Sequence, residues 1–232
     1  MESNPEHIGI ILDGNRRFSK RLMLEPWKGH EYGAKKVSKL FDWCKELDIK
    51  ELTLYMFSMQ NFNRPEKEFN FLMKLFKEFF QDQNHLKTMH DNKIKVKFIG
   101  RIHLFPKEVH ESMVKLMEET KDYDQYHVNF AMAYGGREEV IDGIKKLAND
   151  LKENKISIEK INEESFSPYL YLQSEPDLII RTGGDHRTSN FLIWQSWYSE
   201  WFFLDKFWPE FEKEDLIKII KEFSQRERRF GK

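Results

Sequence analysis

The sequence has a single cysteine among its 232 residues, Cys44, which excludes an internal disulfide and a zinc site built on cysteines. It also has no excess of one charge, because 38 lysines and arginines face 39 aspartates and glutamates. No overall basic field therefore argues for nucleic acid as a partner, although local arginine clusters can still hold a small anion. The low cysteine content fits a reducing compartment such as the cytoplasm.

Long apolar runs are missing as well. No uncharged run approaches the roughly 18 residues that a membrane span needs, and residues 1–6 lack the cationic and apolar regions of a signal peptide. Internal repeats, low-complexity tracts and Gly/Ser linkers are also absent. We therefore expect one soluble or peripheral domain over residues 1–232, with enough hydrophobic residues (40%) for a substantial core.

Short β-type runs alternate with stretches of helical periodicity along the whole chain. This alternation predicts an α/β fold with a central, mostly parallel sheet of six strands and helices on both faces. The predicted strands are 7–12, 52–57, 94–99, 127–132 and 177–181, with a short sixth near 201–204. The predicted helices are 32–47, 66–90, 107–121, 136–153 and 213–228.

The predicted helix at 66–90 has an unusually wide apolar face. Large apolar side chains recur on it at i, i+3 and i+4 spacings, namely Phe69, Leu72, Phe76, Phe79 and Phe80. Such a stripe usually belongs to the core, and the alternative is the wall of a tunnel for a long apolar ligand. The residues alone leave both interpretations open.

Three polar clusters follow predicted strands, at the edge where open α/β sheets collect ligands. Residues 13–17 combine a carboxylate, a Gly-Asn turn and two guanidinium groups. Residues 58–65 carry a hydroxyl, amides and an arginine, and in 181–190 paired glycines expose backbone N–H groups between two arginines. Each cluster alone is compatible with an ordinary turn, but together they predict a metal-assisted phosphate site.

The motifs of nucleotide-binding proteins are not present. The chain contains neither a G-x-G-x-x-G fingerprint nor a G-x-x-x-x-G-K-[ST] loop, so a dinucleotide or nucleoside triphosphate has little support. We therefore expect the anion to be a diphosphate on an apolar tail.

Taken together, these segments closely resemble the cis-prenyltransferase family, which includes the undecaprenyl and dehydrodolichyl diphosphate synthases. The matching pieces run in family order over nearly the whole chain: 7–18, 29–30, 54–65, 129–137, 181–190, 194–195, 200, 208–209 and 226–231. The resemblance implies a Mg²⁺-dependent homodimer that repeatedly condenses isopentenyl diphosphate onto an allylic diphosphate with Z geometry. It also implies an apolar tunnel for the product.

The resemblance assigns roles to individual residues. Asp13 is implied to bind Mg²⁺ at the diphosphates, Glu200 is the second metal-linked carboxylate, and Asn61 lies near the proton that must leave. The implied binders of the allylic diphosphate and its surroundings are Gly14, Asn15, Arg16, Arg17, Phe18 and His30. The implied binders of isopentenyl diphosphate are Arg181, Arg187, Thr188 and Ser189. The remaining implied substrate-binding residues are Ser58 and Gln60, with Phe62 and Arg64 on a loop that closes over substrate.

An asparagine amide is a poor base in water, so we expect Asn61 to orient groups while the released diphosphate takes the proton. Pro26 stands where many bacterial members carry a diphosphate-binding arginine, and the neighbouring Lys28 would have to replace that charge from another direction. Arg16 is typical of archaeal and eukaryotic members, which makes geranylgeranyl diphosphate as plausible a starter as farnesyl diphosphate. Met56 replaces a frequent alanine of long-chain members, and we expect a product of the undecaprenyl class.

Two other functions stay open at this stage. One is a catalytically inactive subunit of a heteromeric synthase, which the retained Asp13, Asn15 and Arg17 disfavour. The other is transfer of a single prenyl group to a different acceptor. Dimerisation and burial inside the monomer explain the aromatic-rich segment 194–208 equally well. The poor solubility of a long prenyl product suggests peripheral membrane contact during its release.

Overall fold

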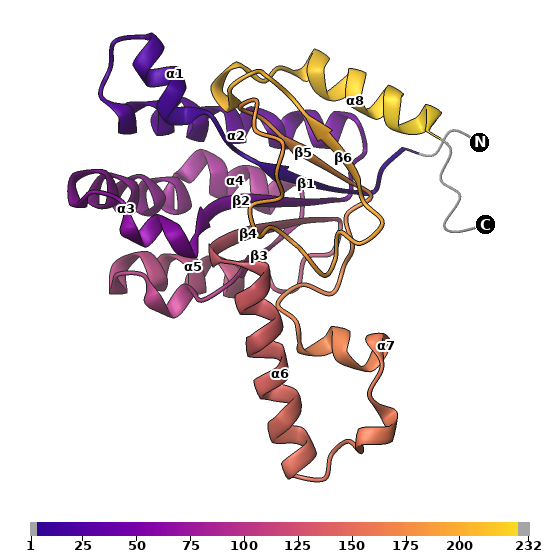
Figure 1. Ribbon diagram of the computed structural model, residues 1–232. Helices are drawn as coiled ribbons and strands as arrows, with labels where there is room; N and C mark the ends of the chain where they lie inside the picture. Colours follow the sequence, from indigo (N-terminus) through magenta and orange to yellow (C-terminus); the bar gives the residue numbers. More distant parts are fainter. Residues whose placement is uncertain (1–3, 227–232) are drawn as a thin grey trace.

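Six strands form one sheet in the order β3-β4-β2-β1-β5-β6, and every pairing between neighbours is parallel (Figure 1). The computed structural model describes residues 4–226. The strands are β1 (His7–Ile11), β2 (Glu51–Ser58), β3 (Ile94–Ile99), β4 (Tyr126–Tyr134), β5 (Leu178–Arg181) and β6 (Glu200–Phe203). All six predicted strands are confirmed, and the sheet is parallel throughout.

Eight α-helices are present between residues 4 and 226. They are α1 (Asn15–Arg21), α2 (Gly29–Glu46), α3 (Glu66–Gln81), α4 (Gln83–Asp91), α5 (Lys107–Thr120), α6 (Gly136–Lys152), α7 (Glu163–Phe166) and α8 (Lys213–Gln225). Short 3₁₀ segments include η1 (Pro26–Lys28) and η2 (Met59–Asn63). The helices α1 and α7 were not predicted, because neither contains enough residues to show a helical period.

The helix predicted at 66–90 is two helices, so this prediction was wrong. Asp82 has extended backbone angles, with φ −64° and ψ 123°, and its carboxylate accepts hydrogen bonds from the backbone N–H groups of Asn84 and His85 at 3.0 Å each. It therefore caps the N-terminus of α4. The apolar pattern continues across this break, which is why periodicity alone does not reveal it.

The helix predicted at 213–228 ends earlier, at Gln225. Arg226 follows it with an extended ψ of 131°. The last two predicted positions, 227 and 228, lie outside the described residues.

Helices cover one face of the sheet and bury the main core there. This core contains side chains from α2, α3, α5 and α8 packed on the strands, including Val37, Leu40, Phe76, Phe80, Met113, Phe130, Ile180 and Leu216. The other face carries a smaller cluster around Tyr55 and Ile179. Its apolar cover is the irregular segment 170–192, which contributes Leu172, Phe191 and Leu192. Helices were expected on both faces, but the second is covered mainly by this segment.

Helix α6 extends away from the sheet, and the segment containing α7 returns beside it (Figure 1). Leu147, Phe166 and Leu170 form a third, small apolar cluster between them. Within residues 4–226, no helix has both the length and the hydropathy needed to cross a membrane.

Candidate active site

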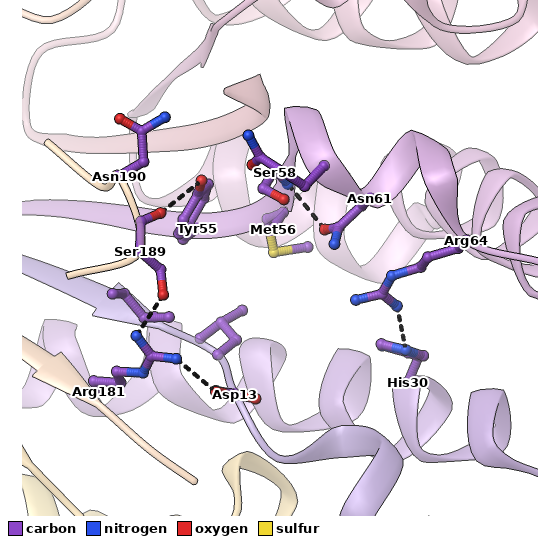
Figure 2. A pocket seen from close by; sticks show the side chains of 13 residues that line it. Asp13, His30, Tyr55, Met56, Ser58, Asn61, Arg64, Arg181, Ser189 and Asn190 are labelled. Carbon is purple, nitrogen blue, oxygen red and sulfur yellow. Dashed lines mark hydrogen bonds and ion pairs between the residues drawn. The ribbon is translucent and has the colours of Figure 1, made fainter. Parts of the chain in front are cut away.

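The three polar clusters predicted from the sequence meet at one edge of the sheet. Strand β1 pairs in parallel with both β2 and β5, so the residues that follow these strands lie side by side. Asp13, Ser58 and Arg181 come from β1, β2 and β5 respectively, and all three line a cavity of about 520 Å³ (Figure 2). We call it the strand-end cavity.

A second cavity of about 420 Å³ adjoins the first, and we call it the arginine cavity. Asp13, His30 and Arg64 line both cavities, so they stand at the boundary between them. The other polar side chains and turn residues of the arginine cavity are Gly14, Asn15, Arg16, Arg17, Lys20, Asp185 and Arg187. Two adjoining cation-lined spaces are what two diphosphate-bearing substrates require.

Asp13 is held by hydrogen bonds from its own turn and from β5. Its Oδ1 accepts from the backbone N–H of Gly14 at 2.6 Å and lies 3.3 Å from Nη2 of Arg17. Its Oδ2 accepts from Nη2 of Arg181 at 2.9 Å. Gly14 has φ 103°, a left-handed angle that glycine adopts without strain, and Phe207 would contact a Cβ there. The carboxylate is therefore fixed in place and still faces both cavities.

Arg181 connects Asp13 to the 181–190 loop. Its side chain is only 3% exposed, and Nη1 donates to Oγ of Ser189 at 2.6 Å and to the carbonyl of Arg187. Arg187 itself lines the arginine cavity and pairs with Asp185 at 2.9 Å. The predicted set of isopentenyl diphosphate binders is therefore divided between the two cavities.

Three cationic or basic side chains at the boundary between the two cavities contact one buried carboxylate. Glu68, 2% exposed, accepts a hydrogen bond from Nη1 of Arg64 at 2.6 Å. It also lies 3.6 Å from Nε2 of His30 and 3.7 Å from Nε of Arg16. Because two guanidinium groups face a single carboxylate, the cluster keeps a positive charge that attracts an anion.

The protonation of this cluster follows from its burial. Desolvation lowers the pKa of His30 below its usual value, although Glu68 acts in the opposite direction. Nε2 of His30 lies 3.1 Å from Nη1 of Arg64 and 3.6 Å from Oε1 of Glu68, so one ring nitrogen contacts both groups. The contact with His30, followed by the charges of Arg64 and Arg16, holds the pKa of Glu68 below its usual value.

The loop that carries Ser189 has an uncommon backbone. Ser189, Asn190 and Leu192 have φ values of 50°, 63° and 43°, all in the left-handed region. Side chains other than glycine adopt these angles only where the surrounding structure holds them. Two hydrogen bonds of the Asn190 side chain stabilise this loop conformation. Its Oδ1 accepts from the N–H of Arg137 at 2.9 Å, and its Nδ2 donates to Glu138 at 2.9 Å.

Tyr55 of β2 contacts the same loop through its hydroxyl group and its ring. Its hydroxyl is shared between the carbonyl oxygens of Tyr134 at 3.2 Å and Ser189 at 3.3 Å, and its ring stacks on Phe191 with centroids 4.8 Å apart. The pairing of β2 with β4 shifts register between Tyr55 and Phe57. Met56 is the extra residue in this pairing, so Phe57 faces the opposite side of the sheet from Tyr55, as bulges near functional sites often re-aim a side chain.

The loop after β2 places its amides at the strand-end cavity. Asn61 and Ser58 form a capping pair, in which the N–H of Ser58 donates to Oδ1 of Asn61 at 2.9 Å. Both residues line the cavity, and so does Gln60. The geometry fixes the Asn61 amide as an acceptor, which fits an orienting role better than that of a base.

Four of the predicted site residues line neither cavity. Phe62 packs in an aromatic cluster with Phe57 at 5.0 Å, and Phe18 packs against Tyr32 at 5.3 Å. Thr188 is exposed outside both cavities.

The fourth, Glu200, lies at the N-terminal end of the parallel strands, away from the cavities. In the register of β5 and β6 it pairs with Leu178, while Phe203 pairs with Arg181. Glu200 forms an ion pair with Arg226 at 2.6 Å. Within one chain, it is not brought to Asp13. Of the last matching piece, 226–231, all but Arg226 lies outside the described residues.

The departure at Pro26 has a structural consequence. Lys28 lines neither cavity and pairs with Glu31 at 3.0 Å on α2. In this structure its ammonium group is therefore paired on the surface and not directed into either cavity. Among the side chains that do line the arginine cavity, Arg16 and Lys20 supply charge instead.

The donor set at Asp13 fits a magnesium ion that arrives with a diphosphate. Mg²⁺ is commonly bound by one or two carboxylates together with substrate phosphates and water. Asp13 offers one such carboxylate, partly exposed to both cavities. Between residues 4 and 226 there is no group of three or more histidines, cysteines or acidic residues arranged to hold a metal by themselves.

An apolar slot of about 50 Å³ opens behind the two cavities. Leu12, His30 and Met56 line both the slot and the strand-end cavity, and α3 contributes Leu72, Phe76 and Phe79 to its wall. The stripe on α3 therefore lies partly along this slot and partly in the core. Phe80 packs on Phe98 in the core, while Phe69 packs on Phe57 and Phe62.

Three residues of the site, Glu68, Asn190 and Tyr55, were not predicted from the sequence. Glu68 carried a signal, because it follows Arg64 by four residues at a helix start, where an acidic and a basic side chain come together. Asn190 carried a weaker one, since asparagine tolerates the left-handed region. Tyr55 gave none, because regular strand alternation places it on the same face as Phe57.

The family model described as "Putative undecaprenyl diphosphate synthase" matches residues 11–231. Two curated relatives, from Methanopyrus kandleri and Pyrococcus furiosus, are each 46% identical over 230 residues, which cover 98% of this chain and 85% and 87% of the relatives. Both are named tritrans,polycis-undecaprenyl-diphosphate synthase (geranylgeranyl-diphosphate specific).

Two solved structures are also similar. Lavandulyl diphosphate synthase from Lavandula x intermedia, in complex with dimethylallyl diphosphate, has a TM-score of 0.94 at 29% identity, with 99% of both chains covered. A probable undecaprenyl diphosphate synthase from Campylobacter jejuni has a TM-score of 0.82 at 33% identity and covers 99% of this chain and 100% of its own. The sequence and the fold thus lead to one conclusion: this chain belongs to the undecaprenyl diphosphate synthase family of prenyltransferases.

Proposed function

We propose that this protein builds a long-chain polyprenyl diphosphate of the undecaprenyl class by repeated cis condensation of isopentenyl diphosphate with geranylgeranyl diphosphate. The observation that carries the proposal is the position of Asp13 between two cation-lined cavities, with an apolar slot behind them. The relatives at 46% identity are named as specific for geranylgeranyl diphosphate, which favours that starter over farnesyl diphosphate.

The arginine cavity fits the allylic diphosphate. In the reaction the allylic C–O bond breaks, and its electron pair leaves with the diphosphate. Arg16 and Arg17 stabilise the charge that develops there, an interaction that is stronger in the transition state than in the ground state. A magnesium ion bound at Asp13 would neutralise part of the same charge.

The strand-end cavity fits isopentenyl diphosphate. Arg181 and Ser189 supply donors for its diphosphate, and its double bond provides the electron pair of the new C–C bond. The condensed cation then loses a proton from the carbon next to its positive centre, and the electron pair of that C–H bond forms the new double bond. Asn61 orients this region, and the released diphosphate accepts the proton.

We further propose that the domain over residues 1–232 acts as a homodimer in contact with a membrane surface during product release. Trp208 and Phe202 are buried within the monomer, but Trp197 is 68% exposed and packs on the half-exposed Tyr198, and Ile193 of the same segment is also half-exposed. A second copy covering these side chains would remove this apolar surface from water. Sedimentation at assay concentration tests the dimer, and a purely monomeric species of 28.2 kDa contradicts it.

The test of the main proposal is a Mg²⁺-dependent assay with labelled isopentenyl diphosphate and either geranylgeranyl or farnesyl diphosphate, followed by analysis of product length. We expect long Z-prenyl products, lost with EDTA and in Asp13→Ala. Asp48→Ala is the matched control, because this exposed carboxylate pairs only with Lys50 in the described structure. Absence of elongation with both starters contradicts the proposal.

A second candidate is a single condensation that does not continue. The fold match to lavandulyl diphosphate synthase supports it, since this structure has a TM-score of 0.94. The higher identity to the polyprenyl synthases and the apolar slot favour elongation. In the same assay, this candidate predicts one prenyl product that stays short at every ratio of the two substrates.

A further inference from the structure

Three consecutive apolar side chains are exposed in the connection between α1 and η1. Leu22, Met23 and Leu24 are 45%, 96% and 40% exposed, and none of them is part of the three apolar clusters of the fold. None lines the strand-end cavity, the arginine cavity or the apolar slot. Figure 1 shows this connection at the outer edge of the molecule, at the end of the sheet where β1 leads into α1. We call residues 22–24 the apolar tip.

The apolar tip has a defined backbone conformation. The N–H groups of Met23 and Leu24 donate to the carbonyl oxygens of Lys20 and Ser19 at 3.0 and 2.9 Å, which is the Schellman pattern of a helix C-terminus. Met23 has φ 56°, in the left-handed region that favours glycine. The N–H groups of the tip are therefore paired within the chain, and its side chains extend from a fixed turn.

Neither packing nor backbone geometry explains a methionine at position 23. Asp48 and Asn154 occupy the equivalent positions after α2 and α6, each with φ 56° and a polar side chain. Glycine would adopt the same angle without strain, and a polar side chain would be better hydrated. An almost fully exposed apolar side chain in such a turn costs the isolated chain stability relative to glycine. It therefore points to an apolar partner outside the chain.

Basic side chains flank the apolar tip. The segment 16–28 contains five lysines and arginines and one glutamate, although the whole chain has a formal net charge of -1. Ion pairs with Glu210 and Glu31 neutralise part of this charge at Arg21 and Lys28. An apolar tip in a basic segment matches an anionic membrane, in which acyl chains lie beneath negatively charged headgroups.

The tip is also close to the arginine cavity in the chain. Arg16, Arg17 and Lys20 of α1 line this cavity, and Lys20 precedes the tip by two residues. Geranylgeranyl diphosphate and a polyprenyl diphosphate are amphiphiles whose long apolar tails partition into membranes. A tip seated in a membrane holds the cavity near the headgroups, at the level of the diphosphates of such molecules.

We propose that the apolar tip inserts into the interfacial region of an anionic membrane, where the basic side chains of segment 16–28 contact the lipid headgroups. The inference rests on the proposed function for its amphiphilic substrate and product, and it adds the surface of the protein that meets the membrane. The occupant of this surface is a lipid bilayer.

Co-sedimentation of the full chain with vesicles tests this surface. The vesicles contain either equal parts of phosphatidylcholine and phosphatidylglycerol or phosphatidylcholine alone. We expect Met23→Gly to lower the partition constant for the mixed vesicles about tenfold, because burial of a methionine side chain contributes at least this factor. Asn154→Gly makes the same backbone change at the end of α6 and should leave the constant unchanged. Vesicles of phosphatidylcholine alone should bind the wild-type chain more weakly, because they lack anionic headgroups.

The stability of the same variant separates membrane contact from a structural role of Met23. Met23→Gly should unfold at the same denaturant concentration as the wild type or at a higher one, because glycine adopts the left-handed angle without strain. A lower midpoint together with weaker vesicle binding would show that Met23 supports the fold, and it overturns the proposal.

A dye attached to the tip reports its surroundings directly. The only native cysteine, Cys44, is buried, so an introduced thiol is labelled alone. The emission of a polarity-sensitive dye on Met23→Cys should shift to shorter wavelength with the mixed vesicles and be quenched by brominated acyl chains. The same dye on Asn154→Cys should show neither effect.

Two outcomes of the dye experiment overturn the proposal. If the protein binds vesicles while the dye on Met23→Cys is unaffected, another surface makes the contact. If the emission shifts without vesicles as the protein concentration rises, the tip meets a second copy of the chain rather than a membrane.

The failure of this inference and that of the proposed function are distinguishable in a detergent solution without vesicles. Met23→Gly should elongate geranylgeranyl diphosphate there at the wild-type rate, since the tip lines none of the cavities. If the wild type elongates in detergent but does not bind the mixed vesicles, the membrane surface is wrong and the proposed function stands. If it binds vesicles through Met23 but incorporates no isopentenyl diphosphate, the proposed function fails while the membrane surface is upheld.

Discussion

Arg181 donates a hydrogen bond from Nη2 to Oδ2 of Asp13 at 2.9 Å and so joins the end of β5 to the end of β1. The bond spans 168 positions in the sequence, yet the parallel register places Arg181 directly beside Ile11, two residues before Asp13. One guanidinium thereby sets the position of the carboxylate between the two cavities and of the Ser189 hydroxyl in one of them.

Arg181→Lys should lower kcat/KM for isopentenyl diphosphate about 100-fold. Lysine keeps the charge but loses the planar fork that reaches Asp13 and Ser189 together, and loss of one preorganised donor costs about 3 kcal/mol of barrier. Steady-state kinetics measure the effect. Arg101→Lys is the control, because Arg101 also binds a carboxylate with two donors, that of Asp142, outside both cavities.

Glu68→Gln should lower the free energy of unfolding by about 2 kcal/mol. The change removes the negative charge that faces the guanidinium groups of Arg64 and Arg16. Because both arginine side chains are partly exposed to water, the cost stays below the 3–5 kcal/mol of a fully buried pair. Denaturant unfolding measures the difference. Glu78→Gln, on an exposed pair with Lys74 on the same helix, should cost less than about 0.5 kcal/mol. Equal losses in both variants contradict the prediction.

Acidification should destabilise the protein through His30. Its pKa in the folded chain is lowered by burial, so below about pH 6.5 the unfolded chain binds a proton that the folded chain resists. Stability is therefore full above the unfolded pKa and falls as the pH drops through this range. We expect His30→Asn to have a shallower decline of unfolding free energy between about pH 7 and pH 5.5. The buried His7, whose pKa is also lowered, contributes the slope that remains in both proteins.

Tyr55→Phe should raise the KM for isopentenyl diphosphate about fivefold and leave the KM for the allylic diphosphate unchanged. The hydroxyl contributes about 1 kcal/mol by holding the Ser189 carbonyl in a left-handed turn, and the ring keeps its stack on Phe191. Substrate titrations separate the two constants. Tyr169→Phe removes a hydroxyl that bonds to Asp150, far from the cavities, and should change neither. A parallel rise of both constants would argue for a general structural effect.

The positions of the polar clusters can be predicted from the sequence, but part of their internal arrangement cannot. The clusters 13–17, 58–65 and 181–190 begin at or just after the ends of strands, and parallel strands bring such positions to one edge. Glu200 also lies in a strand, but at its beginning, so the same rule places it at the far edge of the sheet. The helix break at Asp82 was missed because its cap depends on two backbone N–H groups, and apolar periodicity contains no information about them.

Local periodicity and residue type were enough to predict the alternation of strands and helices, the parallel sheet and the concentration of cations at three strand ends. The family followed from the order of the motifs. Only the tertiary structure decided that Glu68 faces His30, Arg64 and Arg16, and that Tyr55 turns towards Ser189. Those relationships join residues from different elements, and their geometry depends on packing and register rather than on any local pattern.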